Sequence, residues 1–275
     1  MKIAKYPDNQ QLEILLQRPA QASGTRLETN VAAILNQMKR GGDEALKNLT
    51  RQFDGVELDD FEVTPAEIQA ASAAIPASLK TAIRTAAANI ETFHAAQREH
   101  FQPVETMPGV RCWRKSVAIE RVGLYIPGGT APLFSTVLML GIPARLAGCR
   151  EITLCTPPGK DGKVHPAILF AAQFVGIQRI LKVGGAQAIA AMAFGTETIS
   201  PVDKIFGPGN RFVTCAKMLL QKEGIAIDLP AGPSEVLVYA DETCVPSFVA
   251  ADLLSQAEHD VDSQVVFLTI SEKML

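Results

Sequence analysis

Apolar side chains in the first hundred residues recur three and four positions apart, which is the spacing of α-helices. This pattern predicts a helix over residues 26–40 that ends at the glycine pair 41–42. The segment 64–67, TPAE, has the sequence of a capping box with proline at the first helical position, so another helix is expected to begin there. Pro76 predicts a break, after which an alanine-rich helix resumes over residues 79–97.

The pattern changes at residue 116, where short apolar segments begin to alternate with helical ones. Strands are expected within 116–126, 151–157, 179–185, 204–207, 225–230, 234–240 and 264–270. Helices are expected within 133–148, 165–176, 186–195, 210–221 and 245–259. Pro143, inside one of these helical runs, predicts a kink or a break. Strands that alternate with helices of this length predict a mainly parallel sheet covered on both faces, and therefore an α/β fold.

The composition fits a cytoplasmic globular protein. The chain has 275 residues, of which 47% are hydrophobic and 20% charged, so it can bury a sizeable core. Its net charge is −3, and no block of Lys and Arg is present, which argues against a nucleic-acid partner. We expect no membrane partner either, because no apolar run approaches a membrane span or the core of a signal peptide. The five cysteines are scattered without CxxC spacing, which is typical of reduced thiols.

Four glycine-rich turns adjoin the expected strands: YIPGGTAP, VGGAQA, FGPGN and LPAGPSE. In open α/β sheets, ligands bind beyond the carboxyl ends of the strands, and glycine lets the backbone approach a ligand closely. None of the four turns is a GxGxxG or a Walker loop. Together they still predict a ligand crevice at one edge of the sheet.

Polar residues in these turns are candidates for contacts with a ligand. They are Tyr125, Gln187, Asn210 and Ser234. Three of them also have a local explanation, with Asn210 as a helix N-cap, Ser234 in a turn and Tyr125 at the end of a strand. The residues by themselves leave both interpretations open.

The segment LLSQAEHD contains a candidate metal site. Gln256 and His259 are three positions apart at the end of an expected helix, which puts them on one helical face. Imidazole nitrogen is a common zinc ligand, and an amide oxygen is an unusual but competent one. The alternative is a solvated helix end with no ligand role.

Five motifs, in order along the chain, resemble the histidinol dehydrogenase family. They are VGLYIPGGTAPLFSTVLML, VGGAQAIAAMAFGTE, VDKIFGPGN, DLPAGPSEVLV and DLLSQAEHD. The segments RGGDEAL, IETFHAAQ and PGVRCWRK fit the same family, so the resemblance covers nearly the whole chain. It implies incomplete Rossmann-like domains with parallel sheets, preceded by a helical N-terminal region.

The resemblance also implies an activity, its cofactors and its site residues. The family completes histidine biosynthesis by oxidising L-histidinol to L-histidine through the aldehyde, in two NAD-dependent steps, as a zinc-containing homodimer. Its NAD contacts fall on Tyr125, Gln187 and Asn210. Its substrate contacts fall on Ser234, Gln256 and His259, and the last two are also the zinc ligands in this region.

The resemblance further implies that groups needed for catalysis fall beyond residue 275. These are the family's acid–base Glu–His pair and its other two zinc ligands, so no catalytic residue is expected within 1–275. Val261 stands where relatives often have proline, and little effect is expected. The chain also closes on a strand without its covering layer, which predicts an N-terminal portion of a longer protein that is inactive alone.

The expected domains follow from the pattern and the resemblance together. Residues 1–115 form a helical region belonging to the first domain, residues 116–235 form a Rossmann-like NAD-binding domain, and residues 236–275 begin the return into the first domain. The alternative function is a non-catalytic small-molecule binding module on the same fold. A purely structural role is less well supported, because it would not need Gln256 and His259 together.

Overall fold

The computed structural model describes residues 3–17, 25–99, 101–128, 131–230, 235–258 and 263–274. The chain forms two compact units. The larger unit comprises residues 25–230. The smaller one combines residues 1–24 with residues 231–275.

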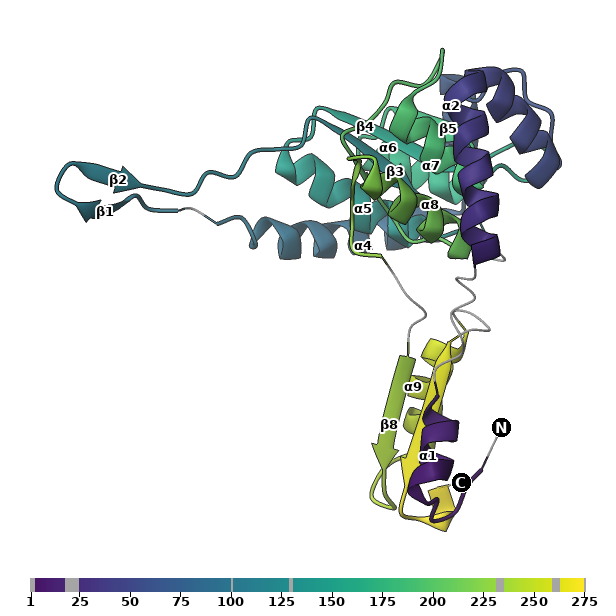
Figure 1. Cartoon of the computed structure of the whole chain (residues 1–275), viewed down its shortest axis with the longest axis vertical. Helices are drawn as coiled ribbons and strands as arrows, with labels where there is room; N and C mark the ends of the chain where they lie inside the picture. The colour runs from purple at the N-terminus through teal and green to yellow at the C-terminus, as the bar shows by residue number, and fades with distance from the viewer. Residues whose placement is uncertain are drawn as a thin grey trace. The chain divides into compact units, whose positions relative to one another are not determined.

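The larger unit is built on a five-stranded sheet in which every neighbouring pair is parallel (Figure 1). The strand order is β5-β4-β3-β6-β7. The strands are β3 (Arg121–Tyr125), β4 (Glu151–Thr156), β5 (Arg179–Lys182), β6 (Lys204–Phe206) and β7 (Ala226–Ile227). The chain moves outward from β3 to β5 and then crosses to the other side of β3 to form β6. The order in which the strands are added therefore reverses between β3 and β6. Ligands bind at this reversal point in folds of this kind.

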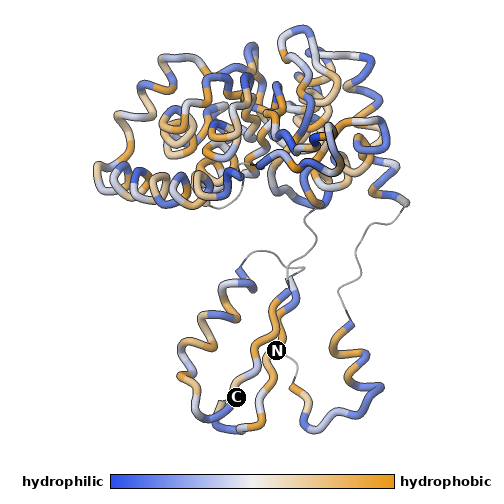
Figure 2. The backbone as a smooth tube through the Cα atoms, turned by 90° about the vertical axis from the view of Figure 1, so that its left-hand side faces the viewer, coloured by the Kyte–Doolittle hydropathy of each residue, from blue (hydrophilic) through white to orange (hydrophobic). Residues whose placement is uncertain are grey.

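Helices cover both faces of this sheet. One face carries α2 (Thr25–Phe53), α7 (Gly185–Phe194) and α8 (Arg211–Lys222). The other carries α5 (Phe134–Ala147) and α6 (Pro166–Phe174), on which α4 (Ala77–Ala95) and α3 (Pro65–Ala74) pack in turn. Hydrophobic segments fill the interior between these layers (Figure 2). The two-sided cover explains why most residues of β3, β4 and β5 are buried regardless of which face they point to.

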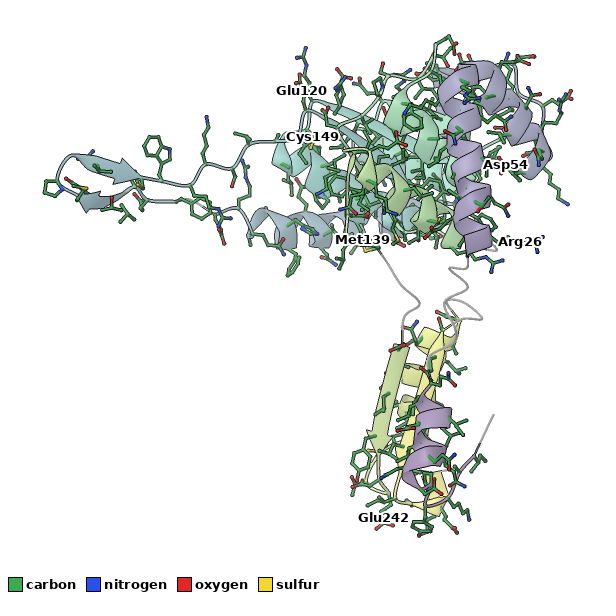
Figure 3. The ribbon with its side chains drawn as sticks, in the orientation of Figure 1. Arg26, Asp54, Glu120, Met139, Cys149 and Glu242 are labelled. Atoms are coloured by element: carbon green, nitrogen blue, oxygen red, sulfur yellow. The ribbon has the colours of Figure 1, made fainter. Side chains whose placement is uncertain are left out.

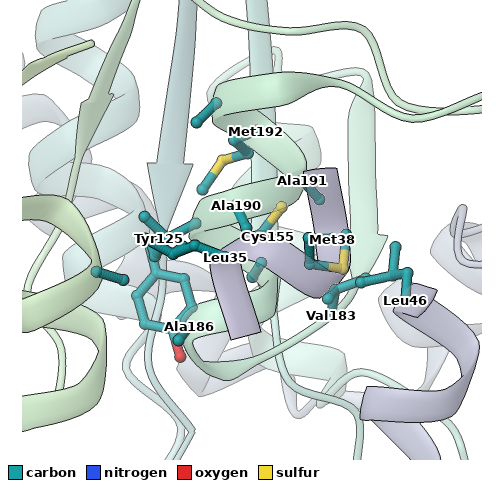
Figure 4. Close-up of a cluster of buried hydrophobic side chains, with 14 of the residues drawn as sticks. Leu35, Met38, Leu46, Tyr125, Cys155, Val183, Ala186, Ala190, Ala191 and Met192 are labelled. Atoms are coloured by element: carbon teal, nitrogen blue, oxygen red, sulfur yellow. The ribbon is translucent and has the colours of Figure 1, made fainter. Parts of the chain in front are cut away.

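Successive strand residues supply the two halves of the core. Tyr125, Cys155 and Leu181 lie in register and pack on the side of α2, α7 and α8. The residues just before them in each strand, Leu124, Leu154 and Ile180, pack on the side of α5 and α6. Helix α7 is mostly alanine and lies so close to β3 that a Cβ built on Gly123 would come within 2.6 Å of Met192 Sδ. Helix α7 therefore packs directly on the sheet, and Figure 4 shows part of the buried cluster to which Tyr125, Ala186, Ala190 and Met192 belong.

The sequence predicted the order and the approximate positions of the strands and helices from residue 116 onward. Every expected strand and helix from residue 116 onward is present, and the breaks at the glycine pair 41–42 and at Pro76 are confirmed. Gly42 has a φ of 46° and interrupts α2, which resumes at once because Glu197 Oε2 accepts a hydrogen bond from the Asp43 N–H at 2.7 Å. The capping box at the start of α3 is also confirmed.

Two features differ from expectation or refine it. Helix α5 runs through Pro143 without a break. A hairpin of β1 (Val104–Met107) and β2 (Val110–Cys112), which the helical pattern did not predict, projects from the rest of the larger unit (Figure 1).

The five cysteines are free thiols, as predicted.

The smaller unit contains a parallel strand pair joined by a helix. Its elements are α1 (Asn9–Leu16), β8 (Glu235–Ala240), α9 (Pro246–Ala257), β9 (Gln264–Thr269) and the 3-10 turn η1 (Glu272–Met274). Strands β8 and β9 pair in register from Glu235 with Gln264 onward. Within the described ranges of both units, no helix combines the length and the hydropathy needed to cross a membrane.

Candidate functional site

The turns that follow β3, β4 and β5 meet at the carboxyl edge of the sheet. A Cβ built on Gly128, after β3, would come within 2.6 Å of Pro157 Cγ. A Cβ built on Gly184, after β5, would come within 2.6 Å of Pro157 Cβ. Glycine is therefore required at both positions, because the turns after β3 and β5 pack closely against Pro157 in the turn after β4.

Tyr125 is the last residue of β3 and points its hydroxyl at the start of α7. The hydroxyl oxygen accepts a hydrogen bond from the Gly185 N–H at 3.0 Å, and it lies beside Ala186 in Figure 4. The side chain is only 3% exposed. Burial raises the pKa of Tyr125 to about 12, and the nearby Asp54 carboxylate adds to the effect. The phenol therefore keeps its proton at neutral pH and remains a hydrogen-bond donor.

Gln187, in the first turn of α7, is linked to a carboxylate that comes from far away in the sequence. Its Nε2 donates to Asp54 Oδ2 at 3.4 Å. Gln187 is buried, whereas Asp54, labelled beside α2 in Figure 3, is half-buried. Burial raises the pKa of Asp54, and the hydrogen bond from Gln187 opposes that rise.

A partly buried ion pair holds the turn after β6. Lys217 Nζ pairs with Asp228 Oδ1 and also donates to the carbonyl oxygen of Gly207 at 2.9 Å. The Gly207 N–H donates to Asp228 Oδ2 at 2.7 Å. Gly207 has a φ of 125°, and a Cβ there would overlap the carbonyl oxygen of Tyr125. The turn after β6 is thus fixed directly against the end of β3.

Asn210 ends this turn and begins α8. Its Oδ1 accepts hydrogen bonds from the N–H groups of Phe212 and Val213 at 3.0 and 3.1 Å. The local interpretation of Asn210 as a helix N-cap is therefore correct. The residue is exposed, and its side-chain nitrogen has no hydrogen-bond partner within the described part of the chain.

The structure brings three of the four candidate turn residues to one edge and one face of the sheet. Tyr125 is hydrogen-bonded to Gly185 and Gln187 to Asp54, both at the start of α7. Asn210 follows the turn that packs on the Tyr125 backbone. Tyr125 and Gln187 are buried and form the floor of this edge. Ser234 lies outside the described residues.

The candidate metal ligands belong to the smaller unit. Gln256 lies in the last turn of α9, is half-buried, and donates from Nε2 to Ser263 Oγ at 3.4 Å. His259 lies outside the described residues. Among those that are described, no three His, Cys, Asp or Glu side chains are grouped closely enough to hold a metal ion.

Asp54, Lys217 and Asp228 were not predicted as site residues from the sequence. Lys217 carried a usable signal, because it lies four positions after Val213 on the apolar side of α8, where a charge needs a partner. Asp54 gave none, because a polar residue before a glycine is an ordinary helix end.

A hollow of about 530 Å³ lies elsewhere, along α2 beside its kink. Its lining includes Asn36, Gln37, Arg40, Glu44 and Asn48. All of its lining residues belong to α2, so none lies at the end of a strand, and none is a His or Cys. The glycine-lined sheet edge is the stronger candidate because its groups converge from several elements.

The strand order and the glycine-lined edge at the reversal point define a doubly wound α/β protein of the Rossmann type. A family model described as histidinol dehydrogenase matches residues 16–275. The chain belongs to the histidinol dehydrogenase family.

Individual relatives agree with the family match. The chain is 60% identical over 274 residues to a histidinol dehydrogenase from Bacteroides fragilis (strain YCH46), covering 100% of this chain and 64% of that protein. It is 57% identical over 261 residues to one from Xylella fastidiosa (strain Temecula1), covering 94% and 61%. The crystal structure of histidinol dehydrogenase from Elizabethkingia anophelis matches with a TM-score of 0.91 at 56% identity, covering 98% and 62%. The chain thus spans slightly less than two thirds of the length of these relatives.

Proposed function

We propose that this chain supplies the NAD-binding part of a cytoplasmic, homodimeric histidinol dehydrogenase. The enzyme would oxidise L-histidinol to L-histidine through the aldehyde in two NAD-dependent steps, with zinc holding the substrate. The single observation that carries the proposal is the glycine-lined edge at the reversal point of the sheet, in a chain 60% identical to a histidinol dehydrogenase.

The residues at this edge suit a dinucleotide. Gly184, the N-cap of α7, makes no side-chain cap bond, and the Gly185 N–H donates to Tyr125, so the N–H groups that follow in the first helical turn are the ones left for a ligand. We assign Asn210 to direct contact through its side-chain nitrogen. Tyr125 and Gln187 are buried, so we assign them to the floor, where Tyr125 fixes Gly185 and Gln187 fixes Asp54. The bound cofactor would accept hydride from the carbon of the alcohol and then of the aldehyde.

Zinc is assigned to Gln256 and His259, and Ser234 to contact with the substrate. An imidazole nitrogen and an amide oxygen form a donor set that zinc accepts, with the substrate's own nitrogens as further donors. By the family resemblance, the acid–base Glu–His pair is not expected among residues 1–275. On this proposal the 275-residue chain alone does not turn over histidinol.

The test is NADH formation from L-histidinol by a full-length protein that carries this chain. His259→Ala should remove the stoichiometric zinc and lower turnover by more than about a hundredfold, because losing even an outer partner of a metal ligand costs about 10–100-fold. His94→Ala is the matched control, since His94 lies on α4 and its ring hydrogen-bonds only to Gln97 within the described part of the chain. It should leave both zinc content and rate unchanged.

Two outcomes would count against the proposal. A His259→Ala protein with full zinc content and normal turnover would refute the metal assignment. Binding of NAD without any NADH formation by the full-length wild type would instead favour a small-molecule binding module.

A further inference from the structure

Many doubly wound domains bind the adenosine ribose through an acidic residue at the carboxyl end of their second strand. Here the second strand outward from the reversal point is β4, which ends at Thr156 and continues into Pro157 and Pro158. The first acid after it is Asp161. Its Oδ1 already accepts a hydrogen bond from the Lys163 N–H of its own loop at 3.2 Å. The usual position therefore lacks an acid.

A carboxylate from another element stands beside that position. Asp54 follows α2, and its Oδ1 lies 3.2 Å from the point where a Cβ on Gly184 would be. The same point is 2.6 Å from Pro157 Cβ, so the Asp54 carboxylate adjoins the turn after β4. Its other oxygen, Oδ2, is held by Gln187.

The free oxygen of this carboxylate is suited to binding a hydroxyl group. Within the described residues, Asp54 Oδ1 has no hydrogen-bond partner and Asp54 forms no ion pair with Lys or Arg. Asp54 is half-buried, so its charge is screened less than that of an exposed acid. A carboxylate accepts hydrogen bonds from hydroxyl groups and repels phosphate groups.

We propose that Asp54 determines the cofactor preference of this chain. Its carboxylate accepts a hydrogen bond from the ribose 2′-hydroxyl of NAD and excludes the 2′-phosphate of NADP. The acid that other Rossmann domains supply from the second strand is supplied here by the end of α2. This inference rests on the proposed function, because it requires the dinucleotide to bind at the same edge.

The test is calorimetric titration of the 275-residue chain with NAD and, separately, with NADP. The wild type should bind NAD more tightly. Asp54→Asn should reduce the ratio of the NAD to the NADP affinity by about tenfold or more, because hydrogen bonds to charged groups contribute about 1.5–3 kcal/mol, or roughly 10–150-fold. Asp54→Glu, which restores the charge, should retain most of the preference.

Asp161→Asn is the matched control, since it removes one charge from the loop after β4. It should leave the ratio unchanged. Unchanged selectivity in Asp54→Asn, or a loss of selectivity in Asp161→Asn alone, would overturn the role of Asp54 while leaving NAD binding at the edge intact. Failure of the wild type to bind either dinucleotide would overturn both this inference and the proposed function. Asparagine has nearly the shape of aspartate, and thermal unfolding of each variant verifies the fold.

Discussion

Gly207→Ala is expected to destabilise the larger unit by about 2–5 kcal/mol and to abolish NAD binding. The φ of Gly207 is 125°, a conformation that alanine adopts only with strain. The added Cβ would also overlap the carbonyl oxygen of Tyr125, which is backbone of a central strand and cannot move aside. Both penalties fall on the turn that joins β6 to Asn210.

Urea unfolding and NAD titration of the same variant measure the two effects. Gly176→Ala is the matched control, because Gly176 also has a positive φ, of 86°, but nothing lies within 4 Å of the Cβ position. It should lose only the conformational part, about 1–2 kcal/mol, and bind NAD normally. Equal losses in the two variants would show that the contact with Tyr125 does not matter.

Lys217→Met is expected to reduce the free energy of unfolding by about 3 kcal/mol. The change leaves the Asp228 carboxylate without its cation and removes the hydrogen bond to the Gly207 carbonyl. Broken buried pairs typically lose about 3–5 kcal/mol, and the lower end applies because the Asp228 side chain remains 27% exposed. NAD binding should weaken as well, because the turn after β6 loses its anchor.

Chemical denaturation at neutral pH measures this loss against two references. Lys39→Met breaks the exposed pair with Glu223, whose side chains are 56% and 46% exposed, and should lose less than about 1 kcal/mol. The double variant Lys217→Met/Asp228→Asn should recover part of the stability by removing the unpaired charge. A Lys217→Met protein as stable as Lys39→Met would contradict the anchoring role.

The sequence predicted strands best where helices cover both faces of the sheet. The strand 151–156 is buried over its last four residues because helices cover both faces, and its place between two helical segments identifies it. The hairpin 104–112 escaped prediction because its strands are only four and three residues long and fully exposed, which is too short for a sustained alternation of apolar and polar positions.

The residues of the candidate site were likewise predictable only where a local sequence pattern marks them. Glycine-rich turns mark strand ends locally, which is why Tyr125, Gln187 and Asn210 could be found. Asp54 meets Gln187 across 133 residues of sequence, and only the packing of α2 on α7 creates that contact. For Asn210 the sequence left two roles open. They are compatible, because the cap uses the side-chain oxygen and the proposed ligand contact uses the nitrogen.

On this proposal NAD binds where the strand order of the sheet reverses. A crystal structure of the 275-residue chain with NAD tests it most directly. We predict that the dinucleotide lies across the carboxyl ends of β3 and β6, within hydrogen-bond distance of the Asn210 side chain and over the floor formed by Tyr125 and Gln187. Bound NAD in the hollow along α2, or on the opposite edge of the sheet, would contradict the claim.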